Sequence, residues 1–450
     1  MRLAISLLVF STLAIETNAQ VNVQAFGVVG DGGLTNNQPG IKAAIESLGA
    51  NGGSVYFPTA PAAYSFDTTI VVPRNVIIEC SAPDAVTLRY TGSGAAFVWA
   101  DPGADTAYNR GGMRDCRLSG PGATSSAVGI FSGGGFPVGS GTIVPASWRG
   151  DFLTFFNDKI TDFNIGYETG NHTWENNFIS TLFTNNSVGW KINPGVENGE
   201  NIAMHGGAIQ NGITAIINNN VNADLVFHGI SIDAITGAAV LSGDSSIDGG
   251  TVELVDPHIE YFGNPSTPVF QVWGQGPFSM IKVRDGVIQF NQTAASAESL
   301  VKMCSTATCQ PFTGNPHTAG FILSGTQIRG SASLTWSGAC SISSPGICIE
   351  GDNTVQDAVI EPYSFWSGGS FGSPGGTQVL PGLQNLIQYS GAGGGVLSPP
   401  TCNQSSPQRN VCAVDAVSCG VNNQYVPFGS NRCTLTCAGN AGWRTTGIGC

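Results

Sequence analysis

The sequence predicts an all-β chain wound as a single-stranded parallel β-helix, and two observations lead to this prediction. The first is composition: the 450 residues include 62 glycines, and only 10% are charged. Helical surfaces usually carry more Lys, Glu and Arg, so this composition indicates short strands joined by tight turns. The second is an internal repeat with spacings of 23, 27 and 29 residues, which is typical of stacked solenoid coils.

The first 19 residues have the features of a secretory signal peptide. Arg2 supplies a positive start, residues 3–15 form an apolar stretch, and Thr17-Asn18-Ala19 supplies the small residues of a cleavage site. The apolar stretch is too short to span a bilayer, and no later segment has the composition of a membrane span. We therefore expect cleavage after Ala19 and a secreted protein.

The next segment predicts a helix followed by a strand. Residues 35–37 are of the helix-capping type, and apolar residues recur at helical spacing through Leu48, so we expect a helix over 38–48. An Asn-Gly-Gly turn then leads into a strand at 54–57 that ends at Pro58. The glycines of this segment match neither the Walker nor the GxGxxG spacing, which argues against a phosphate-binding loop.

This opening segment resembles that of the pectate-lyase-like superfamily of right-handed parallel β-helices. The shared features are a Phe-Gly-Val tripeptide at Phe26, a Gly-Asp-Gly tripeptide at Gly30, the capped helix, and Gly52-Gly53 before a strand that ends in proline. The chain departs from the pattern at Asn36-Asn37, where aspartates are usual. The resemblance implies a right-handed, pectin-lyase-like coil whose open N-terminal end is covered by the capping helix.

Members of this superfamily mostly cleave acidic polysaccharides, so the resemblance also implies a glycan-degrading activity. Their catalytic motifs are not matched: the chain has no adjacent Asp-Asp pair, and residues 205–207 and 282–284 are only partial echoes of polygalacturonase motifs. The calcium-holding acidic cluster and catalytic arginine of the pectate lyases have no recognisable equivalent either. The resemblance therefore carries the fold to this chain, and it does not carry the reaction.

The repeat predicts which residues face inward. Four segments align without a gap: IAMHGGAIQ (202–210), LVFHGISID (225–233), VELVDPHIE (252–260) and IKVRDGVIQ (281–289). Their apolar residues share columns, as expected for side chains stacked inside successive coils of three short strands. Further coils are expected at 160–167 and 177–184, and Ile328 continues the last apolar column.

Changes in composition divide the chain into four regions. Residues 390–400 are rich in Gly and Pro, as in a linker, and cysteines crowd into the residues that follow. We expect this last region to be held together by disulfides, as a cap or a binding module. The expected regions are a signal peptide (1–19), a parallel β-helix domain (22–390), a Gly/Pro linker (391–400) and a small Cys-rich C-terminal module (401–450).

Twelve cysteines fit an oxidising compartment, where disulfides persist. Cys80 and Cys116 are placed to tie neighbouring coils, and the pairs 304/309 and 340/348 are close enough for local bridges. The six cysteines after residue 400 permit 15 pairings, among which the sequence does not choose. A zinc site is the competing interpretation, but the chain has no CxxC pair and its last 50 residues contain no histidine, so we expect no metal.

The charge balance restricts the partners. The chain carries 17 basic and 30 acidic residues, a formal net charge of −13, and its pI is about 4.7. An acidic surface repels phosphate backbones, so nucleic acid is not expected as a partner. The same field weakly disfavours polyanionic substrates. A polysaccharide is the expected partner, and the sequence does not distinguish a monomer from a trimer.

One outward-facing column is expected to carry catalytic carboxylates. In the aligned segments it contains Gln210, Asp233, Glu260 and Gln289, which places Asp233 and Glu260 on the surface of adjacent coils. Two carboxylates at that spacing suit a glycosidase, with one of them held protonated as the acid. His258 lies two residues before Glu260 and is expected on the same face as a further catalytic residue.

A second outward column adds the remaining polar candidates. His205 and His228 occupy the same position in adjacent coils, and His228 precedes Asp233 across a glycine turn, which makes it a catalytic candidate. We expect His205, Lys282 and Arg284 to contact substrate, the two cations by meeting an acidic sugar. Stacked polar ladders are also common as purely structural features of solenoids, and this interpretation stays open for both columns.

Trp174 is the aromatic candidate for substrate binding. It belongs to a group of tryptophans that precedes the clearest repeats, together with Trp148 and Trp190. An exposed indole is a good platform for the apolar face of a sugar ring. Burial inside the solenoid is the competing interpretation for each of the three.

These observations favour a secreted polysaccharide-degrading enzyme, a glycoside hydrolase that works through Asp233 and Glu260. Two alternatives stay open. One is a polysaccharide lyase in which His258 removes the proton next to a uronate carboxyl, aided by Arg284. The other is a non-catalytic glycan-binding or surface protein. No cofactor is expected, because no cofactor or metalloenzyme motif is present.

Overall fold

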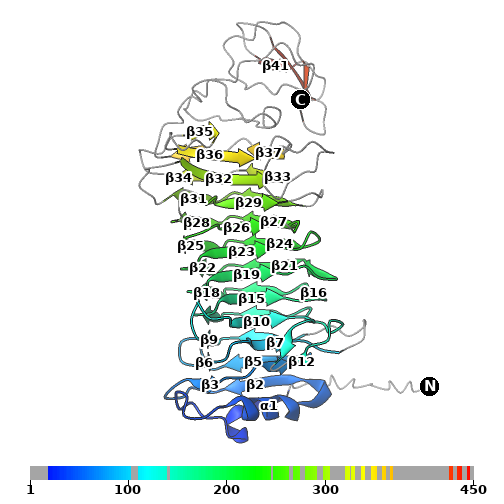
Figure 1. Ribbon diagram of the computed structural model, residues 1–450, viewed down its shortest axis with the longest axis vertical. Helices are drawn as coiled ribbons and strands as arrows, with labels where there is room; N and C mark the ends of the chain where they lie inside the picture. Colours follow the sequence, from blue (N-terminus) through cyan, green and yellow to red (C-terminus); the bar gives the residue numbers. More distant parts are fainter. Residues whose placement is uncertain are drawn as a thin grey trace, which may run out of the picture.

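The computed structural model describes residues 19–102, 110–138, 142–244, 247–262, 267–273, 279–290 and 297–304, and beyond these only isolated short segments between 320 and 445. Within these residues most strands belong to three parallel sheets, here called sheets A, B and C. Successive strands of each sheet come from successive coils and are stacked along the long axis of the molecule (Figure 1). The expected parallel β-helix is confirmed.

Sheets A and B contribute the first two strands of each coil. Sheet A consists of β1 (Gln20–Asn22), β2 (Gly53–Phe57), β5 (Val76–Cys80), β8 (Gly112–Arg114), β13 (Thr154–Phe156), β17 (Asn177–Ile179), β21 (Ile202–His205), β24 (Asp224–His228), β27 (Thr251–Val255), β30 (Met280–Arg284), β33 (Gly320–Ser324) and β37 (Asp357–Ile360). Sheet B consists of β3 (Tyr64–Phe66), β6 (Thr87–Tyr90), β9 (Arg117–Ser119), β14 (Lys159–Thr161), β18 (Leu182–Thr184), β22 (Ala208–Gln210), β25 (Ser231–Ile235), β28 (His258–Tyr261), β31 (Val287–Phe290), β34 (Gln327–Arg329) and β38 (Phe365–Ser367).

Sheet C completes each coil, and a few short elements lie outside the three sheets. Sheet C consists of β4 (Ile70–Val72), β7 (Ala95–Trp99), β10 (Val128–Ser132), β15 (Ile165–Thr169), β19 (Val188–Ile192), β23 (Thr214–Asn218), β26 (Val240–Ser242), β29 (Phe270–Trp273), β32 (Ala297–Cys304), β36 (Gly346–Gly351) and β35 (Trp336–Ala339). The other elements are the 3-10 turns η1 (Val23–Phe26) and η2 (Gly49–Asn51), the helix α1 (Gln38–Ser47), and the strand pairs β11 (Pro137–Val138) with β12 (Thr142–Ile143) and β16 (Thr173–Trp174) with β20 (Asn198–Glu200).

The register between coils is the one that the repeat predicts. Ile202 pairs with Leu225, Leu225 with Val252, and Val252 with Ile281, and the column of Ile209 continues to Ile328 as expected; the pairs of that last column are Ile209–Ile232, Ile232–Ile259, Ile259–Ile288 and Ile288–Ile328. Because side chains alternate along a strand, fixing the inward column also fixes which residues face outward.

The turn between sheets A and B has a constant length. In seven successive coils, from β8–β9 to β30–β31, two residues separate the strands, and the first of them has a positive φ. These first residues are Asp115, Asn157, Ser180, Gly206, Gly229, Asp256 and Asp285. The N–H of each of the first six donates to a carbonyl of the following coil. Short polar residues and glycine are the types that tolerate this backbone conformation.

Stacked aromatic and aliphatic side chains fill the interior. Phe155 belongs to one coil, and Phe178 and Trp190 belong to the next; all three are fully buried, and the rings of Phe155 and Phe178 stack with centroids 4.5 Å apart. The ring centroid of Trp190 lies 4.6 Å from that of Phe178 and 4.9 Å from that of Phe227 in β24. Burial of such large rings is the main source of stability in a column whose coils contact only their neighbours.

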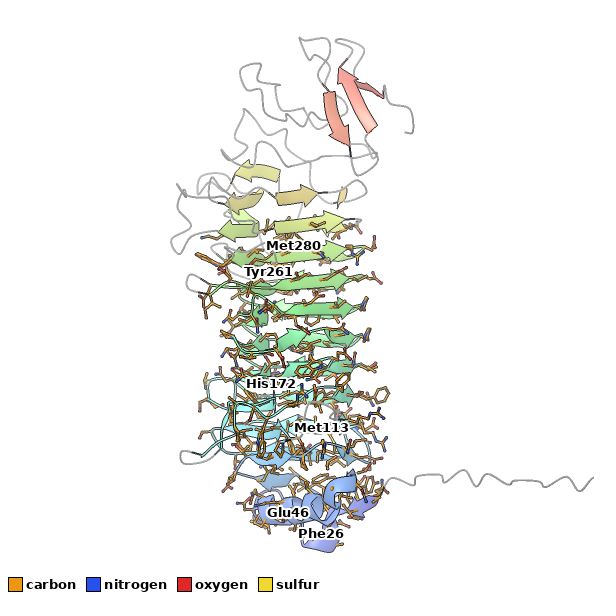
Figure 2. The ribbon with its side chains drawn as sticks, turned by 90° about the vertical axis from the view of Figure 1, so that its right-hand side faces the viewer. Phe26, Glu46, Met113, His172, Tyr261 and Met280 are labelled. Carbon is orange, nitrogen blue, oxygen red and sulfur yellow. A yellow bond between two sulfur atoms is a disulfide. The ribbon has the colours of Figure 1, made fainter. Side chains whose placement is uncertain are left out.

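The helix forms where the apolar spacing predicts it and covers the N-terminal end of the column (Figure 1). Ile41, Ala44 and Ile45 of α1 are buried in the same core as the strand interior. Figure 2 shows Phe26 and Glu46 at this end, with Met280 several coils away. The disulfide between Cys80, at the end of β5, and Cys116, in the A–B turn of the following coil, joins neighbouring coils as expected.

Several sequence predictions lie outside the described residues. They include the signal peptide before Ala19, the Gly/Pro linker, and most of the region expected to be a Cys-rich module. In that last region the structure describes one antiparallel sheet, formed by β39 (Tyr425–Phe428), β40 (Cys433–Cys437) and β41 (Trp443–Thr445). The domain boundaries therefore stay predictions.

Candidate functional site

Two adjacent strands of sheet B bring four polar residues together on the outer surface. Asp233 of β25 pairs directly with Glu260 of β28, and Ser231 pairs with His258. The residues between them in each strand, Ile232 and Ile259, are fully buried, so the flanking side chains face outward. We call Ser231, Asp233, His258 and Glu260 the sheet B cluster.

The imidazole of His258 lies between the two carboxylates. Its Nδ1 is 3.5 Å from Asp233 Oδ1, and its Nε2 is 3.9 Å from Glu260 Oε1. Ser231 Oγ donates a 2.7 Å hydrogen bond to Asp233 Oδ2 and lies 3.3 Å from His258 Nδ1. Asp233 Oδ2 therefore accepts a hydrogen bond, whereas Asp233 Oδ1 is buried and is approached by His258 without a hydrogen bond. Glu260 faces the histidine at a longer distance.

The sheet B cluster is open to solvent. The side chains of His258, Glu260 and Asp233 are 46%, 35% and 27% exposed. Part of each side chain is therefore within reach of a polymer, although the Oδ1 atom of Asp233 is itself buried. With both carboxyl groups ionised, the local charge is negative whether the histidine is neutral or protonated.

The other histidines lie on sheet A, across the A–B turn from the cluster. His205 and His228 pair in register, and their rings stack with centroids 5.1 Å apart and planes 3° apart. Both side chains are exposed. The stack confirms that His205 and His228 share one outward column, as predicted. These two side chains project from sheet A, whereas that of Asp233 projects from sheet B. His228 and Asp233 thus lie on different faces of the coil.

The two cations expected to meet an acidic sugar are already paired. Arg284 contacts Glu253 Oε1 through Nη2, and Lys282 Nζ lies 3.9 Å from Glu253 Oε2. All three residues project from sheet A, where Glu253 pairs in register with Lys282. The structure therefore brings neither cation to the sheet B cluster.

The tryptophans separate into core and surface. Trp190 is fully buried, as its competing interpretation predicts. Trp174 is partly exposed, but the guanidinium of Arg149 lies over its ring, 4.5 Å from the centroid. One face of this indole is thus occupied by a cation. His172, which lies 6.4 Å from the Trp174 ring, forms a 2.9 Å contact with Glu197.

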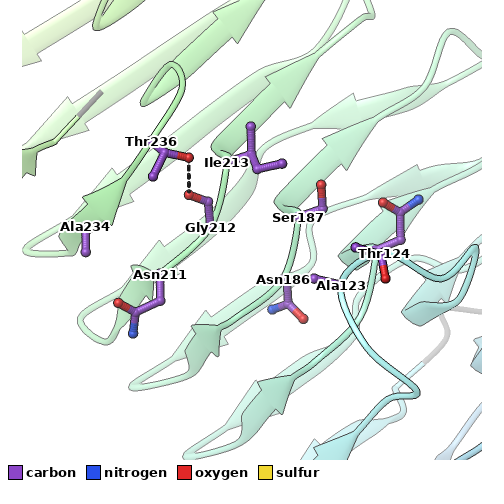
Figure 3. Close-up of a pocket in the computed structure, with 10 residues that line it drawn as sticks. Ala123, Thr124, Asn186, Ser187, Asn211, Gly212, Ile213, Ala234 and Thr236 are labelled. Atoms are coloured by element: carbon purple, nitrogen blue, oxygen red, sulfur yellow. Dashed lines mark hydrogen bonds between the residues drawn. The ribbon is translucent and has the colours of Figure 1, made fainter. Parts of the chain in front are cut away.

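A pocket of about 470 Å³ lies at the corner between sheets B and C. It crosses five successive coils and ends at the coil that carries Asp233 (Figure 3). We call it the corner pocket; residues that line it include Thr124, Ser187, Asn211, Ile213, Ala234 and Thr236. Sequence reasoning missed it, because its residues lie beyond the ends of the aligned segments. Ser231 was also missed as a site residue, although it lies two residues before Asp233 and therefore faces outward on the same strand.

Metal and membrane features are absent from the part of the chain that the structure describes. No group of three or more His, Cys, Asp or Glu side chains there is arranged to hold a metal ion. Within the same residues, no helix has the length and apolar character needed to cross a membrane.

Comparison with known proteins finds only distant structural similarity. No protein-family model matches the chain, and no curated protein matches it significantly. Among solved structures, the chain is similar to the A-module of a mannuronan C-5 epimerase from Azotobacter vinelandii, with 17% identity over 83% of this chain and 98% of that module and a TM-score of 0.45. It is also similar to a tailspike of an Acinetobacter phage, with 11% identity over 96% of this chain and 83% of the tailspike and a TM-score of 0.45.

A third similar structure is PfbA, a surface adhesin of Streptococcus pneumoniae, with 12% identity over 96% of this chain and 99% of the adhesin and a TM-score of 0.42. An epimerase, a tailspike and an adhesin differ in what they do, and similarity at this level carries no argument about the activity of this chain.

Proposed function

We propose that this protein is secreted and acts on a polysaccharide, as a glycoside hydrolase whose catalytic residues are Asp233, Glu260 and His258. The observation that carries the proposal is the placement of an exposed imidazole between two carboxylates on adjacent coils. Glycosidases use a pair of carboxyl groups that flank the scissile bond. A solvent-open outer face of a long column suits a polymeric substrate.

The environments of the two carboxyl groups suggest different roles. Asp233 accepts a hydrogen bond from Ser231 and faces His258, contacts that stabilise negative charge, so it is suited to attack the anomeric carbon. Glu260 has fewer polar contacts and is suited to give its proton to the glycosidic oxygen. The backbones of paired residues on neighbouring strands lie about 4.8 Å apart, which allows the two carboxyl groups to approach the roughly 5 to 5.5 Å of retaining glycosidases once a substrate displaces the imidazole between them. We therefore propose retention of configuration.

His258 is placed to orient the two carboxyl groups. Its Nδ1–H can donate to Ser231 Oγ while Ser231 donates to Asp233, and its Nε2 faces Glu260. In the first half of the reaction Glu260 gives its proton to the leaving oxygen, and in the second half it takes a proton from the attacking water, which restores its starting protonation state. His258, whose Nε2 faces Glu260, is placed to orient that carboxyl group through both halves.

The lyase alternative receives less support. Removal of a proton next to a uronate carboxyl needs a cation to neutralise that carboxylate. Arg284 and Lys282, the cations expected for this task, project from sheet A and are paired with Glu253. The sheet B cluster itself is acidic, so a uronate would be repelled there.

A second candidate is a non-catalytic glycan-binding protein. The exposure of the sheet B cluster favours it, because catalytic carboxyl groups commonly lie in more enclosed sites. The stacked rings of His205 and His228 on sheet A provide a further flat surface on which a sugar ring could lie.

The test is hydrolysis of a panel of neutral and uronate polysaccharides by the purified protein. New reducing ends report hydrolysis, and ultraviolet absorbance of unsaturated uronates reports a lyase. We expect reducing ends without that absorbance, and a loss of activity of about 10²- to 10⁴-fold in Asp233→Asn and Glu260→Gln, since each removes an acid–base or nucleophilic group. Formate should partly restore Asp233→Ala, because a small carboxylate can replace a missing nucleophile.

The matched control is Asp224→Asn, which removes an exposed carboxylate from β24 of the same coil on the sheet A side. It should keep wild-type activity. Activity that survives both Asp233→Asn and Glu260→Gln would show that the catalytic site lies elsewhere. Absence of activity on the whole panel, with retained binding to one of its polysaccharides, would favour the non-catalytic candidate.

A further inference from the structure

The corner pocket has the position expected of a substrate groove that leads to the sheet B cluster. It is formed where each coil passes from sheet B to sheet C, and it therefore runs along the axis of the column (Figure 3). Successive coils are about 4.8 Å apart, so the five coils it crosses give space for several units of an extended polymer. Its volume of about 470 Å³ lies within the usual range of ligand sites, roughly 300 to 1,000 Å³.

The lining is polar but uncharged. None of its residues is Asp, Glu, Lys, Arg or His, and the polar groups are the amides and hydroxyls of Asn, Ser and Thr. Asn211 and Thr236 are exposed and offer groups that can bond sugar hydroxyls. Ile213 is 55% exposed, and this apolar side chain within a polar lining suits the C–H face of a sugar ring.

Ala234 joins the corner pocket to the sheet B cluster. It directly follows Asp233, lines the pocket, and has a φ of 51°, a conformation that alanine rarely adopts. The register between β25 and β28 shifts at this residue, which marks a β-bulge next to the candidate catalytic carboxylate. Bulges and strained residues recur beside active sites, where they direct side chains.

We propose that the corner pocket binds uncharged sugar units of the glycan, on the N-terminal side of the cleavage point at Asp233 and Glu260. This inference rests on the proposed function and adds a substrate class to it: a neutral polysaccharide. The charge balance agrees, because a uronate chain would find no cation in the pocket and two carboxylates at its end.

The test compares a pocket variant with a matched control on long and short substrates. The pocket variant is Asn211→Gly with Ile213→Ala; glycine keeps the positive φ of 56° at position 211, so the turn itself is not strained. The control is Asn201→Gly with Val196→Ala, which changes an exposed asparagine with a φ of 49° and an exposed apolar residue outside the pocket.

On long oligosaccharides of the neutral glycan that the protein cleaves, the pocket variant should raise KM about tenfold and leave kcat within about twofold, as expected for lost binding that is uniform along the reaction. On an aryl monoglycoside of the same sugar, which is too short to reach the pocket, pocket and control variants should match the wild type. The control variant should match it on both substrates.

The outcomes separate the two proposals. If the pocket variant has the wild-type KM while Asp233→Asn and Glu260→Gln are inactive, the corner pocket does not bind substrate. The proposed hydrolase activity would still be supported. The wild type could instead cleave nothing and still bind cello-, manno- or xylo-oligosaccharides. If the pocket variant weakens this binding and the control variant does not, the pocket assignment is supported and the catalytic role of Asp233 and Glu260 is rejected. Preferential binding of uronate oligosaccharides would overturn the neutral class.

Discussion

Asp158 is a buried carboxyl group in the A–B turn, far from any candidate role in catalysis. It is 2% exposed, and its Oδ1 accepts a 2.9 Å hydrogen bond from the N–H of Cys116. Its Oδ2 is buried, and within the described residues it has no hydrogen-bond partner. Burial raises the pKa of Asp158 well above 3.8, the Cys116 N–H opposes this shift only in part, and the nearby Asp115 adds to it.

This pKa predicts that Asp158 makes the protein less stable as pH rises. The folded state keeps a proton that the unfolded chain releases above about pH 4. The contribution of Asp158 is therefore fully present below pH 4 and is lost at about 1.4 kcal/mol per pH unit until the folded pKa is reached. Asp158→Asn, which resembles the protonated acid, should raise Tm at pH 7 and match the wild type near pH 4 in thermal unfolding followed by circular dichroism.

The exposed Asp224→Asn serves as the control and should leave Tm unchanged at both pH values. An Asp158→Asn variant that is less stable than the wild type at pH 7 would contradict the prediction, because it would show that the carboxyl is ionised and bound by a partner.

At this scale the sequence predicted positions better than roles. Asp233 and Glu260 were expected side by side, and they are, because the apolar residues Ile232 and Ile259 fix the parity of their strands. The interaction of Lys282 and Arg284 with Glu253 could not be predicted in the same way. The alignment gives the coil and the parity of a residue, but it does not give the side-chain torsions that decide which partner a long cation reaches.

The helix α1 depends on an asparagine that does not cap it. Asn37 has no capping hydrogen bond; its side chain, 2% exposed, accepts from the N–H of Val29 and donates to the carbonyls of Val29 and Ser65. Asn36 Oδ1 instead accepts from the N–H of Gln38. The sequence predicted a capped helix, and the helix is present. The side-chain amide of Asn37, however, holds α1 against the first coil through its bonds to Val29 and Ser65.

Asn37→Asp should therefore destabilise the protein. A carboxylate cannot donate to the carbonyls of Val29 and Ser65, and it would place negative charge against both in a buried position. We expect a loss of about 3 kcal/mol or more in the free energy of unfolding, from two missing hydrogen bonds and an unsatisfied buried group. Urea denaturation followed by tryptophan fluorescence measures it.

Asn36→Asp is the matched control for this element. It makes the same chemical change one residue earlier at an exposed position, where water replaces the lost hydrogen bond to Asp67 and screens the repulsion between the two carboxylates. Its loss should stay below about 1 kcal/mol. Equal effects of the two substitutions would contradict the distinct role of Asn37.

As a whole, the molecule is a column in which each coil contacts mainly the coils before and after it. The stability of such a chain is a sum over neighbouring units, and unfolding can begin at an end. The disulfide between Cys80 and Cys116 lies close to the N-terminal end, joins two coils and spans 36 residues of sequence. It therefore protects the part of the column where separation of coils would start.

Cys80→Ser with Cys116→Ser should weaken the N-terminal coils selectively. Closure of a loop of this length contributes about 4 kcal/mol in the chain-entropy account. We expect faster hydrogen exchange in β2, β5 and β8, with little change in β21, β24 and β27, as measured by mass spectrometry. Uniform acceleration across all six strands would show that the column unfolds as a single unit.

The fold of the whole molecule could be predicted from the sequence because the turn from sheet A to sheet B has a constant length. The two-residue A–B turn keeps the nine-residue segments from 202 to 289 in gapless alignment, so the repeat is visible. The links from sheet C back to sheet A vary in length, as between β10 and β13 and between β23 and β24, and those from sheet B to sheet C also differ, as between β9 and β10 and between β22 and β23. The corner pocket lies in the links from sheet B to sheet C, beyond the ends of the aligned segments, which is why the repeat did not reveal it.

The same constancy determines where foreign peptide can be introduced. One residue added to an A–B turn would reverse the parity of the strand that follows and expose its apolar side chains. The return from sheet C to sheet A has no such restriction: residues 219–223 bridge it in one coil and residues 133–153 in another. An epitope or a second domain grafted into these returns would project from an edge that neither the sheet B cluster nor the corner pocket occupies.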